Sequence, residues 1–298
     1  CILYKNNILT QYLMEIEVKG HSGCQINIIR EQNELYIYKT TNDKTYLHRL
    51  IKQANKQKTA TQIEYQHIRV PQVYDITHSS QQASIKMEYV YSKNFIEYFE
   101  SAGFEQINYF IKALILFIEK ELHSSPLQQI SASIIQKKFI DVKQKINANP
   151  LLTSDAEIIE IVNRSTTVFN QLNTIEMPVG VCHGDLTFSN ILFNGNNYYL
   201  IDFLDSFIEA PLLDIVKIRQ DSAHLWSQLM YTKSYDQIRL QIVCEKIDCE
   251  IDQYFQRYKW YKHYYQMFQL MNMLRILQYA HEENVISYLK IQIKSLLP

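Results

Sequence analysis

The polar residues best suited to chemistry are Asp185, Asn190 and Asp202, which stand five and twelve positions apart in one stretch of the chain. Phosphoryl transfer needs a carboxylate that accepts the proton of an attacking hydroxyl, together with oxygen ligands that hold metal ions against nucleotide phosphates. Asp185 is the candidate for the first task, and Asn190 and Asp202 are the candidates for the second. The alternative is an ordinary β-hairpin with a polar loop, which would not require three such residues at this spacing.

Apolar residues flank these side chains and indicate the elements that must hold them. Residues 181–182 are predicted as a strand, residues 183–190 as a loop, and residues 191–193 and 199–201 as the strands of a hairpin. The turn of this hairpin is Asn194-Gly195-Asn196-Asn197. The loop before the hairpin and the acidic turn after it are therefore expected at one end of a small sheet.

Two short motifs carry a resemblance to a known family. His183-Gly184-Asp185 with Asn190, followed by Ile201-Asp202-Phe203, resembles the signature of the kinase-like phosphotransferases typified by aminoglycoside phosphotransferases and choline kinases. Protein kinases usually have Arg in place of Gly184 and Gly in place of Leu204. These two departures favour a small-molecule kinase over a protein kinase.

The resemblance implies an α/β (α+β) architecture, the two-lobed protein-kinase-like fold. A small antiparallel β lobe over residues 1–90 would bind the nucleotide, and a larger, mainly helical lobe over residues 91–298 would carry the catalytic hairpin. The resemblance also gives His183 and Asp214 structural roles, His183 in bracing the catalytic loop and Asp214 in tying the large lobe together.

The first part of the chain has the pattern of a small sheet. Residues 11–41 alternate apolar and polar side chains in three short runs, which predicts an antiparallel meander. Lys39 in the third run is the candidate for the lysine that holds nucleotide phosphates, and the alternative is an exposed strand lysine. By resemblance, the loop between the first two runs covers the phosphates, while a plain turn is the alternative. The loop residues are Gly20, His21, Ser22 and Gly23.

A helix is predicted over residues 43–58, where apolar residues recur with helical spacing. The resemblance expects a glutamate on this helix that pairs with Lys39, but the helix contains none. Gln57 stands near the expected position, whereas Glu64 would serve only if the helix were longer. Both alternatives stay open at this point.

Two further strands, over residues 70–76 and 83–90, complete the predicted small lobe. By resemblance, the second strand leads into the hinge that binds the nucleotide base through backbone hydrogen bonds. The residues placed against the base are Met87, Glu88, Tyr89 and Val90.

From Phe95 onward the pattern becomes helical. Aromatic residues from Tyr254 to Phe268 predict a helix that is apolar on nearly all sides, either packed in the core or forming a cage for a quaternary ammonium group. Asp205 either faces the metals and the acceptor or is open to solvent. A candidate substrate wall is formed by Arg219, Gln220, Asp221 and Trp226.

The composition is that of a globular protein. The 298 residues carry 30 Lys and Arg against 31 Asp and Glu, so we expect neither a nucleic-acid partner nor a membrane-binding patch. Five cysteines without C-x-x-C spacing favour reduced thiols, and hence a cytoplasmic location, over disulfides or a zinc site. No apolar run approaches the roughly 20 residues that span a bilayer. The chain begins with Cys1 rather than Met, which is consistent with a piece of a longer polypeptide.

Together these features predict transfer of the γ-phosphoryl group of ATP or GTP to a hydroxyl of a small molecule, with Mg²⁺ as cofactor. A sugar or sugar-like alcohol is the first candidate acceptor, and a choline-like amine is the second. Asp185 would orient and deprotonate the hydroxyl, Asn190 and Asp202 would bind Mg²⁺, and Lys39 would hold phosphates. The alternatives are a nucleotide-binding pseudokinase or regulatory module, which the missing helix glutamate favours, and a protein kinase.

Overall fold

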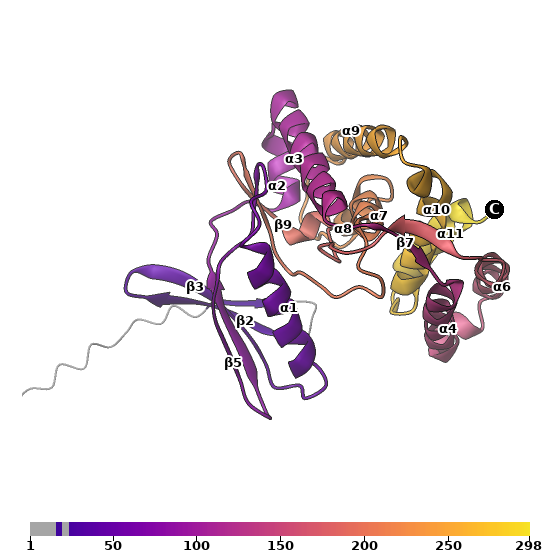
Figure 1. The fold of residues 1–298 in the computed structure, drawn as a ribbon, viewed down its shortest axis with the longest axis horizontal. Helices are drawn as coiled ribbons and strands as arrows, with labels where there is room; N and C mark the ends of the chain where they lie inside the picture. The colour runs from indigo at the N-terminus through magenta and orange to yellow at the C-terminus, as the bar shows by residue number, and fades with distance from the viewer. Residues whose placement is uncertain (1–15, 20–23) are drawn as a thin grey trace, which may run out of the picture. The chain divides into compact units, whose positions relative to one another are not determined.

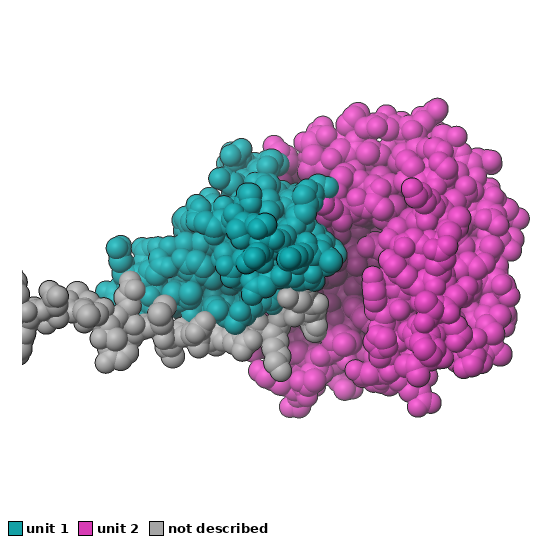
Figure 2. Space-filling view, turned by 90° about the horizontal axis from the view of Figure 1, so that it is seen from below, with its two compact units in different colours: residues 1–64, 69–91, 201–203 teal, residues 65–68, 92–200, 204–298 magenta. Residues whose placement is uncertain are grey.

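The computed structural model describes residues 16–19 and 24–298 of the chain, which form two compact units (Figures 1 and 2). Unit 1 comprises the described residues up to 64 together with residues 69–91 and 201–203. Unit 2 comprises residues 65–68, 92–200 and 204–298. Two short segments, 65–68 and 201–203, thus belong to a different unit from their neighbours in sequence. The predicted division at residue 90 stays a prediction.

Unit 1 contains a five-stranded antiparallel sheet in the order β1-β2-β3-β6-β5. Its strands are β1 (Ile16–Lys19), β2 (Gln25–Glu31), β3 (Glu34–Thr41), β5 (Val73–His78) and β6 (Ala83–Glu88). The alternating pattern of the sequence therefore predicted the meander and the two later strands correctly within the described residues.

One helix, α1 (Leu47–Ala60), lies along the sheet of unit 1 (Figure 1). Its apolar side chains follow helical spacing, so that Leu50 and Ala54 are buried against Val73 and Ile85 of the sheet. The helix begins four residues later than predicted because Asp43 accepts a hydrogen bond from the backbone of Thr45 and closes a turn there.

Unit 2 is mainly helical, as predicted. Its helices are α2 (Phe95–Ser101), α3 (Phe104–His123), α4 (Ala132–Ala148), α5 (Pro150–Thr153), α6 (Ala156–Asn170), α7 (Pro211–Ser222), α8 (Trp226–Leu229), α9 (Gln237–Phe255), α10 (Lys259–Leu277) and α11 (Glu283–Leu296). None of the helices within residues 24–298 is long and apolar enough to cross a membrane.

The single aromatic helix predicted from Tyr254 to Phe268 is in fact two helices. The helices α9 and α10 are separated at Tyr258, whose backbone is extended. The Tyr258 ring stacks on Trp260 with 5.2 Å between ring centroids, and its hydroxyl donates to Glu119 of α3 at 2.7 Å. These contacts stabilise the extended backbone between α9 and α10. Trp260 and Phe268 are buried, which supports core packing rather than an aromatic cage.

Short strands precede and follow the loop at residues 183–190 in the chain. They are β4 (Ile68–Arg69), β9 (Ile191–Asn194) and β10 (Asn197–Leu200) in one sheet, β7 (Leu127–Ile130) and β8 (Ile175–Pro178) in another. The hairpin β9–β10 confirms the prediction, with Gly195 in the left-handed conformation that its turn requires. The strand predicted at residues 181–182 does not form, because the Val181 N–H donates to the hydroxyl of Ser125 rather than to a neighbouring strand.

Candidate active site

In unit 1, the buried Lys39 forms an ion pair with the partly exposed Asp202, although 163 positions separate them in the sequence. Lys39 lies on the central strand β3 and is 5% exposed. Its Nζ is 2.7 Å from Oδ1 of Asp202. Burial alone would lower the pKa of Lys39, but the Asp202 carboxylate outweighs it, so this pKa lies above its usual value. Lys39 is therefore a protonated donor at neutral pH.

The backbone of Asp202 is also unusual. Its φ is 60°, in the left-handed region that residues other than glycine seldom occupy. Such conformations cost free energy and are concentrated at functional sites, where surrounding contacts hold them. The ion pair with Lys39 is one such contact.

The expectation that Gln57 pairs with Lys39 is corrected by the structure. The Gln57 amide is buried and donates to the carbonyl of Pro71 at 3.0 Å and to Sδ of Met87 at 3.6 Å. Gln57 therefore ties α1 to the segment before β5. Glu64 lies beyond the end of α1 and is exposed. The described partner of Lys39 is Asp202, which sequence spacing along α1 could not reveal.

The other residues predicted to bind nucleotide in unit 1 fall into two groups. Residues 20–23, the predicted phosphate-covering loop, lie outside the described part of the chain. The predicted hinge begins at the end of β6, where Glu88 exchanges backbone and side-chain hydrogen bonds with Gln72. Tyr89 and Val90 follow directly after Glu88, the last residue of β6. Their contact with a nucleotide base stays a prediction.

In unit 2, the carboxylate of Asp185 is held from two sides. Its Oδ2 accepts a hydrogen bond from the Asn190 amide at 3.0 Å, and the same amide donates to the Asp185 carbonyl at 2.8 Å. Its Oδ1 lies 3.0 Å from Nζ of Lys217 on α7. The Asp185 side chain nevertheless keeps 26% of its surface exposed. It is thus fixed in place and still open to a reactant.

Two buried carboxylates of α7 anchor the backbone of this loop. Asp214 accepts hydrogen bonds from the backbone N–H groups of His183 and Gly184. Asp221 accepts from the backbone of Phe188 at 2.6 Å with one oxygen, and from Ser227 with the other. Asp214 therefore ties the large unit together in the way that the resemblance implies.

Lys217 determines the charge state of Asp185. Burial would raise the pKa of Asp185, but the positive charge of Lys217 and its hydrogen bond, with further help from His183 and Asn190, lower that pKa below its ordinary value. Asp185 is therefore a carboxylate at neutral pH, as a group that accepts a hydroxyl proton must be.

Sequence reasoning missed Lys217 and gave Asp221 a different role. Asp214, Lys217 and Asp221 stand at i, i+3 and i+7, which places them on one face of α7. A polar stripe on an otherwise buried helix was the signal that could have found them. Two residues of the predicted substrate wall have other contacts. Asp221 accepts hydrogen bonds from the backbone of the catalytic loop, and Arg219 forms ion pairs with Asp248 and Asp252.

The raised pKa of Asp221 predicts a pH-dependent stability. Burial raises this pKa from 3.8 to about 6, so between these pH values the folded state binds more protons than the unfolded state. The contribution of Asp221 to the free energy of unfolding is largest below about pH 4. It falls by up to roughly 3 kcal/mol as the pH rises to about 6. In Asp221→Asn this titration is absent. Urea denaturation across this range should therefore show wild type losing stability relative to the variant as the pH rises.

Asp75→Asn replaces an exposed carboxyl group on β5 and is the control for the general effect of an aspartate-to-asparagine replacement on stability. If the stability difference between wild type and Asp221→Asn were independent of pH, the raised pKa would be wrong.

The predicted metal ligands offer suitable oxygen atoms. Within the described residues, no cluster of three or more His, Cys, Asp or Glu side chains forms a metal site. The Asp202 carboxylate in unit 1 is 39% exposed. In unit 2, the Asn190 amide nitrogen is directed to Asp185, so the carbonyl oxygen of that amide is the atom suited to a cation. Carboxylate and amide oxygens are hard donors of the type that Mg²⁺ prefers, so each residue suits the role predicted for it.

Comparison with known proteins identifies a family. The model of the phosphotransferase enzyme family matches residues 36–237, more than half of the chain. No curated protein matches the sequence.

Solved structures are similar over nearly the whole chain, at low sequence identity. The amicoumacin kinase hAmiN, in complex with AMP-PNP, Ca²⁺ and Ami, has a TM-score of 0.62 at 10% identity and covers 95% of this chain and 90% of its own. The GDP and kanamycin complex of APH(2")-IIia has a TM-score of 0.60 at 12% identity, covering 97% and 96%. A choline/ethanolamine kinase family protein from Mesorhizobium loti has a TM-score of 0.58 at 12% identity, covering 97% and 89%. This likeness confirms the predicted α+β kinase-like fold.

Proposed function

Because this chain belongs to the phosphotransferase enzyme family, and is thus a small-molecule kinase, we propose that it transfers the γ-phosphoryl group of ATP or GTP to a hydroxyl of a sugar or sugar-like alcohol. The observation that carries the proposal is the Asp185 carboxylate, which is ionised, partly exposed and held by Asn190 and Lys217. A fixed carboxylate of this kind suits a residue that must orient a hydroxyl.

In the proposed reaction, Asp185 accepts a hydrogen bond from the acceptor hydroxyl and takes its proton as the oxygen attacks the γ-phosphorus. Lys217 keeps Asp185 ionised before this step. The hydrogen bonds from the loop backbone to Asp214 and Asp221 preserve the position of the base, since a shift of about 1 Å would cost up to roughly 10²-fold in rate.

The nucleotide side of the proposal assigns Lys39 to the phosphates and Asp202 and Asn190 to Mg²⁺. When bound, the cation would neutralise charge on the phosphate oxygens. The Lys39–Asp202 ion pair supports the assignment, because it keeps a protonated lysine and an ionised carboxylate in contact. The three assignments follow the family signature and are proposals for this chain.

Release of nucleoside diphosphate tests the function directly. The protein would be incubated with ATP or GTP, Mg²⁺ and a panel of sugars, sugar alcohols and amino alcohols, beside generic protein substrates. Release that depends on a small hydroxyl acceptor supports the proposal. Nucleotide binding without release would favour the pseudokinase alternative, and phosphorylated protein would favour a protein kinase.

Lys217→Met should slow turnover, on the order of tenfold or more, because Asp185 loses one of the two groups that hold it. It should also move the acid limb of the pH–rate profile to higher pH, since burial then raises the pKa of Asp185 without the opposing charge. Steady-state release of nucleoside diphosphate across the acid range measures both effects. Lys262→Met, an exposed lysine on α10, is the matched control. An acid limb that stayed in place would refute the role given to Lys217.

A cytoplasmic location also belongs to the proposal. It follows from the five cysteines without C-x-x-C spacing; among the described residues, Cys24, Cys182, Cys244 and Cys249 form no disulfide.

A further inference from the structure

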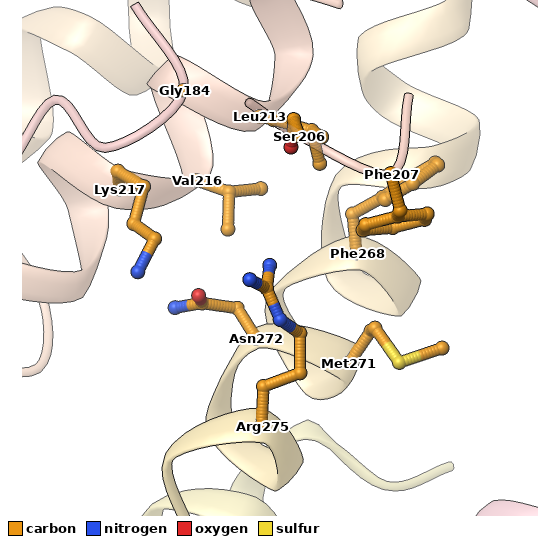
Figure 3. Close-up of a pocket in the computed structure, with 10 residues that line it drawn as sticks. All are labelled: Gly184, Ser206, Phe207, Leu213, Val216, Lys217, Phe268, Met271, Asn272 and Arg275. Atoms are coloured by element: carbon orange, nitrogen blue, oxygen red, sulfur yellow. The ribbon is translucent and has the colours of Figure 1, made fainter. Parts of the chain in front are cut away.

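A pocket in unit 2 adjoins the catalytic loop, but Lys217 and Asn272 on its lining already have partners (Figure 3). Lys217 pairs with Asp185, and Asn272 donates a hydrogen bond to the buried Gln220 at 2.8 Å. The pocket has room for about one water molecule. A buried donor without a partner is found instead in unit 1, on the helix α1.

Two glutamines are buried on the face of α1 that packs against the sheet. Gln53 and Gln57 stand one helical turn apart, beside the apolar Leu50 and Ala54. The Gln57 amide donates to the carbonyl of Pro71 at 3.0 Å, so its burial is compensated. The burial of the Gln53 amide needs a separate explanation.

The Gln53 amide is only half satisfied. Its Oε1 accepts a hydrogen bond from the Tyr46 hydroxyl at 3.2 Å. Its Nε2 is buried and has no hydrogen-bond partner within residues 16–19 and 24–298. A buried N–H group without a partner costs free energy, whereas a methionine of similar size could pack at this position without that cost. The N–H group therefore suits an acceptor that binds from outside the chain.

The geometry of unit 1 places Gln53 level with Lys39. Nε2 of Gln57 lies 3.6 Å from Sδ of Met87 on β6. Gln53 stands one turn, or about 6 Å, before Gln57 on the helix. Ile85 stands two residues, or about 7 Å, before Met87 on the strand. Ile85 packs against α1 and is the ladder partner of Lys39, and paired side chains of an antiparallel sheet lie on the same face.

Tyr46 links the two residues independently. Its ring packs against the apolar cluster between α1 and the sheet, and its hydroxyl donates to Gln53. Burial lowers the pKa of Lys39 and Asp202 raises it, and Tyr46 adds to the increase, so the phenol oxygen lies near the lysine. The Gln53 amide, the Tyr46 hydroxyl and the Lys39–Asp202 ion pair are therefore neighbours in unit 1.

We propose that Gln53 is a further phosphate-binding residue, whose Nε2 donates a hydrogen bond to an oxygen of the nucleotide phosphates that Lys39 holds. The inference rests on the proposed function, because it takes Lys39 as a ligand of the phosphates. A glutamate on this helix, which the resemblance expects, has no N–H to donate at neutral pH and would repel a phosphate. The amide instead leaves Asp202 as the ion-pair partner of Lys39 and adds a donor for an anionic oxygen.

Substitutions of the two buried glutamines test the inference. In each variant, the dissociation constants of the nucleoside and of its non-hydrolysable triphosphate with Mg²⁺ are measured by NMR titration and calorimetry. Gln53→Met should reduce the gain in affinity from nucleoside to triphosphate by roughly tenfold or more, the value of a hydrogen bond to a charged group. Gln57→Met, the matched control on the same face of α1, should leave this gain unchanged. The gain within one variant is insensitive to the fraction of folded protein.

Thermal unfolding without nucleotide distinguishes a ligand-binding role from a structural one. Gln53→Met removes an N–H group that has no partner, so its unfolding temperature should stay close to that of wild type. Gln57→Met should unfold at a lower temperature, because the Pro71 carbonyl loses its donor. A large loss of stability in Gln53→Met, with an unchanged gain in affinity, would make Gln53 a structural residue and overturn the inference.

Gln53→Glu separates a phosphate donor from a partner of Lys39. This change keeps the length of the side chain but replaces the N–H group by a negative oxygen, so the gain in affinity should fall further than in Gln53→Met. A gain equal to or above that of wild type would show that a carboxylate serves Lys39 at this position, and would overturn the inference.

The outcomes also separate the inference from the function on which it rests. If wild type binds the triphosphate more tightly than the nucleoside and Gln53→Met does the same to an equal degree, only the role of Gln53 is removed. An equal loss in Gln53→Met and Gln57→Met would remove it too, because the effect would then belong to α1 in general. If wild type binds no nucleotide, the proposed function fails together with the inference.

Discussion

Asp185→Asn is expected to lower turnover by on the order of 10²- to 10⁴-fold while leaving metal–nucleotide binding largely unchanged. The carboxylate is assigned to the acceptor hydroxyl, and an amide of the same shape cannot accept its proton. The contacts of Asp185 are with Asn190 and Lys217, both in unit 2, and neither requires a nucleotide. Steady-state rates with a verified acceptor, beside calorimetric titration with Mg²⁺ and a non-hydrolysable nucleotide, separate the two effects.

Asp141→Asn is the matched control for this prediction. Asp141 is also a partly exposed carboxylate beside lysines, 3.0 Å from Lys138 and 3.1 Å from Lys145 on α4, but it lies outside the catalytic loop. Its replacement should leave turnover within about twofold of wild type, as expected for a surface ion pair. Normal turnover in Asp185→Asn would remove the central assignment of the proposed mechanism.

The sequence correctly predicted those parts of the site in which the functional residues and the strands that hold them are neighbours in the chain. The loop at residues 183–190 and the hairpin β9–β10 occupy adjacent positions in the chain, so spacing alone constrains them. Alternating side chains predicted the strands of unit 1, because a half-buried antiparallel sheet requires that pattern.

The contacts that the sequence did not predict join residues far apart in the chain. Lys217 meets Asp185 because α7 presents one polar face to the catalytic loop, and nothing near Asp185 in the sequence indicates that face. The error at Gln57 has a similar cause. Counting positions along α1 placed Gln57 toward Lys39, whereas the packing of α1 directs its amide to the Pro71 carbonyl.

The pairing of Lys39 with Asp202 also changes how the second aspartate should be tested. Asp202→Asn is expected to weaken metal–nucleotide binding together with turnover, since it removes a negative charge assigned to Mg²⁺. It also leaves the buried Lys39 ammonium without its described carboxylate partner, and an uncompensated buried charge is destabilising. Loss of activity in this single variant therefore has two possible sources, a lost metal ligand and a disturbed lysine.

A double-mutant cycle of Lys39→Met, Asp202→Asn and the combined variant separates these sources. For stability, measured by thermal unfolding without nucleotide, the combined variant should be less destabilised than the sum of the single variants, because no buried Lys39 ammonium is left without its carboxylate. For binding of Mg²⁺ with a non-hydrolysable nucleotide, Asp202→Asn should still weaken binding on the Lys39→Met background, by roughly tenfold or more, if the carboxylate is a metal ligand. Equal metal–nucleotide affinity of Lys39→Met and the combined variant would show instead that Asp202 acts only through Lys39, and would remove it from the proposed metal site.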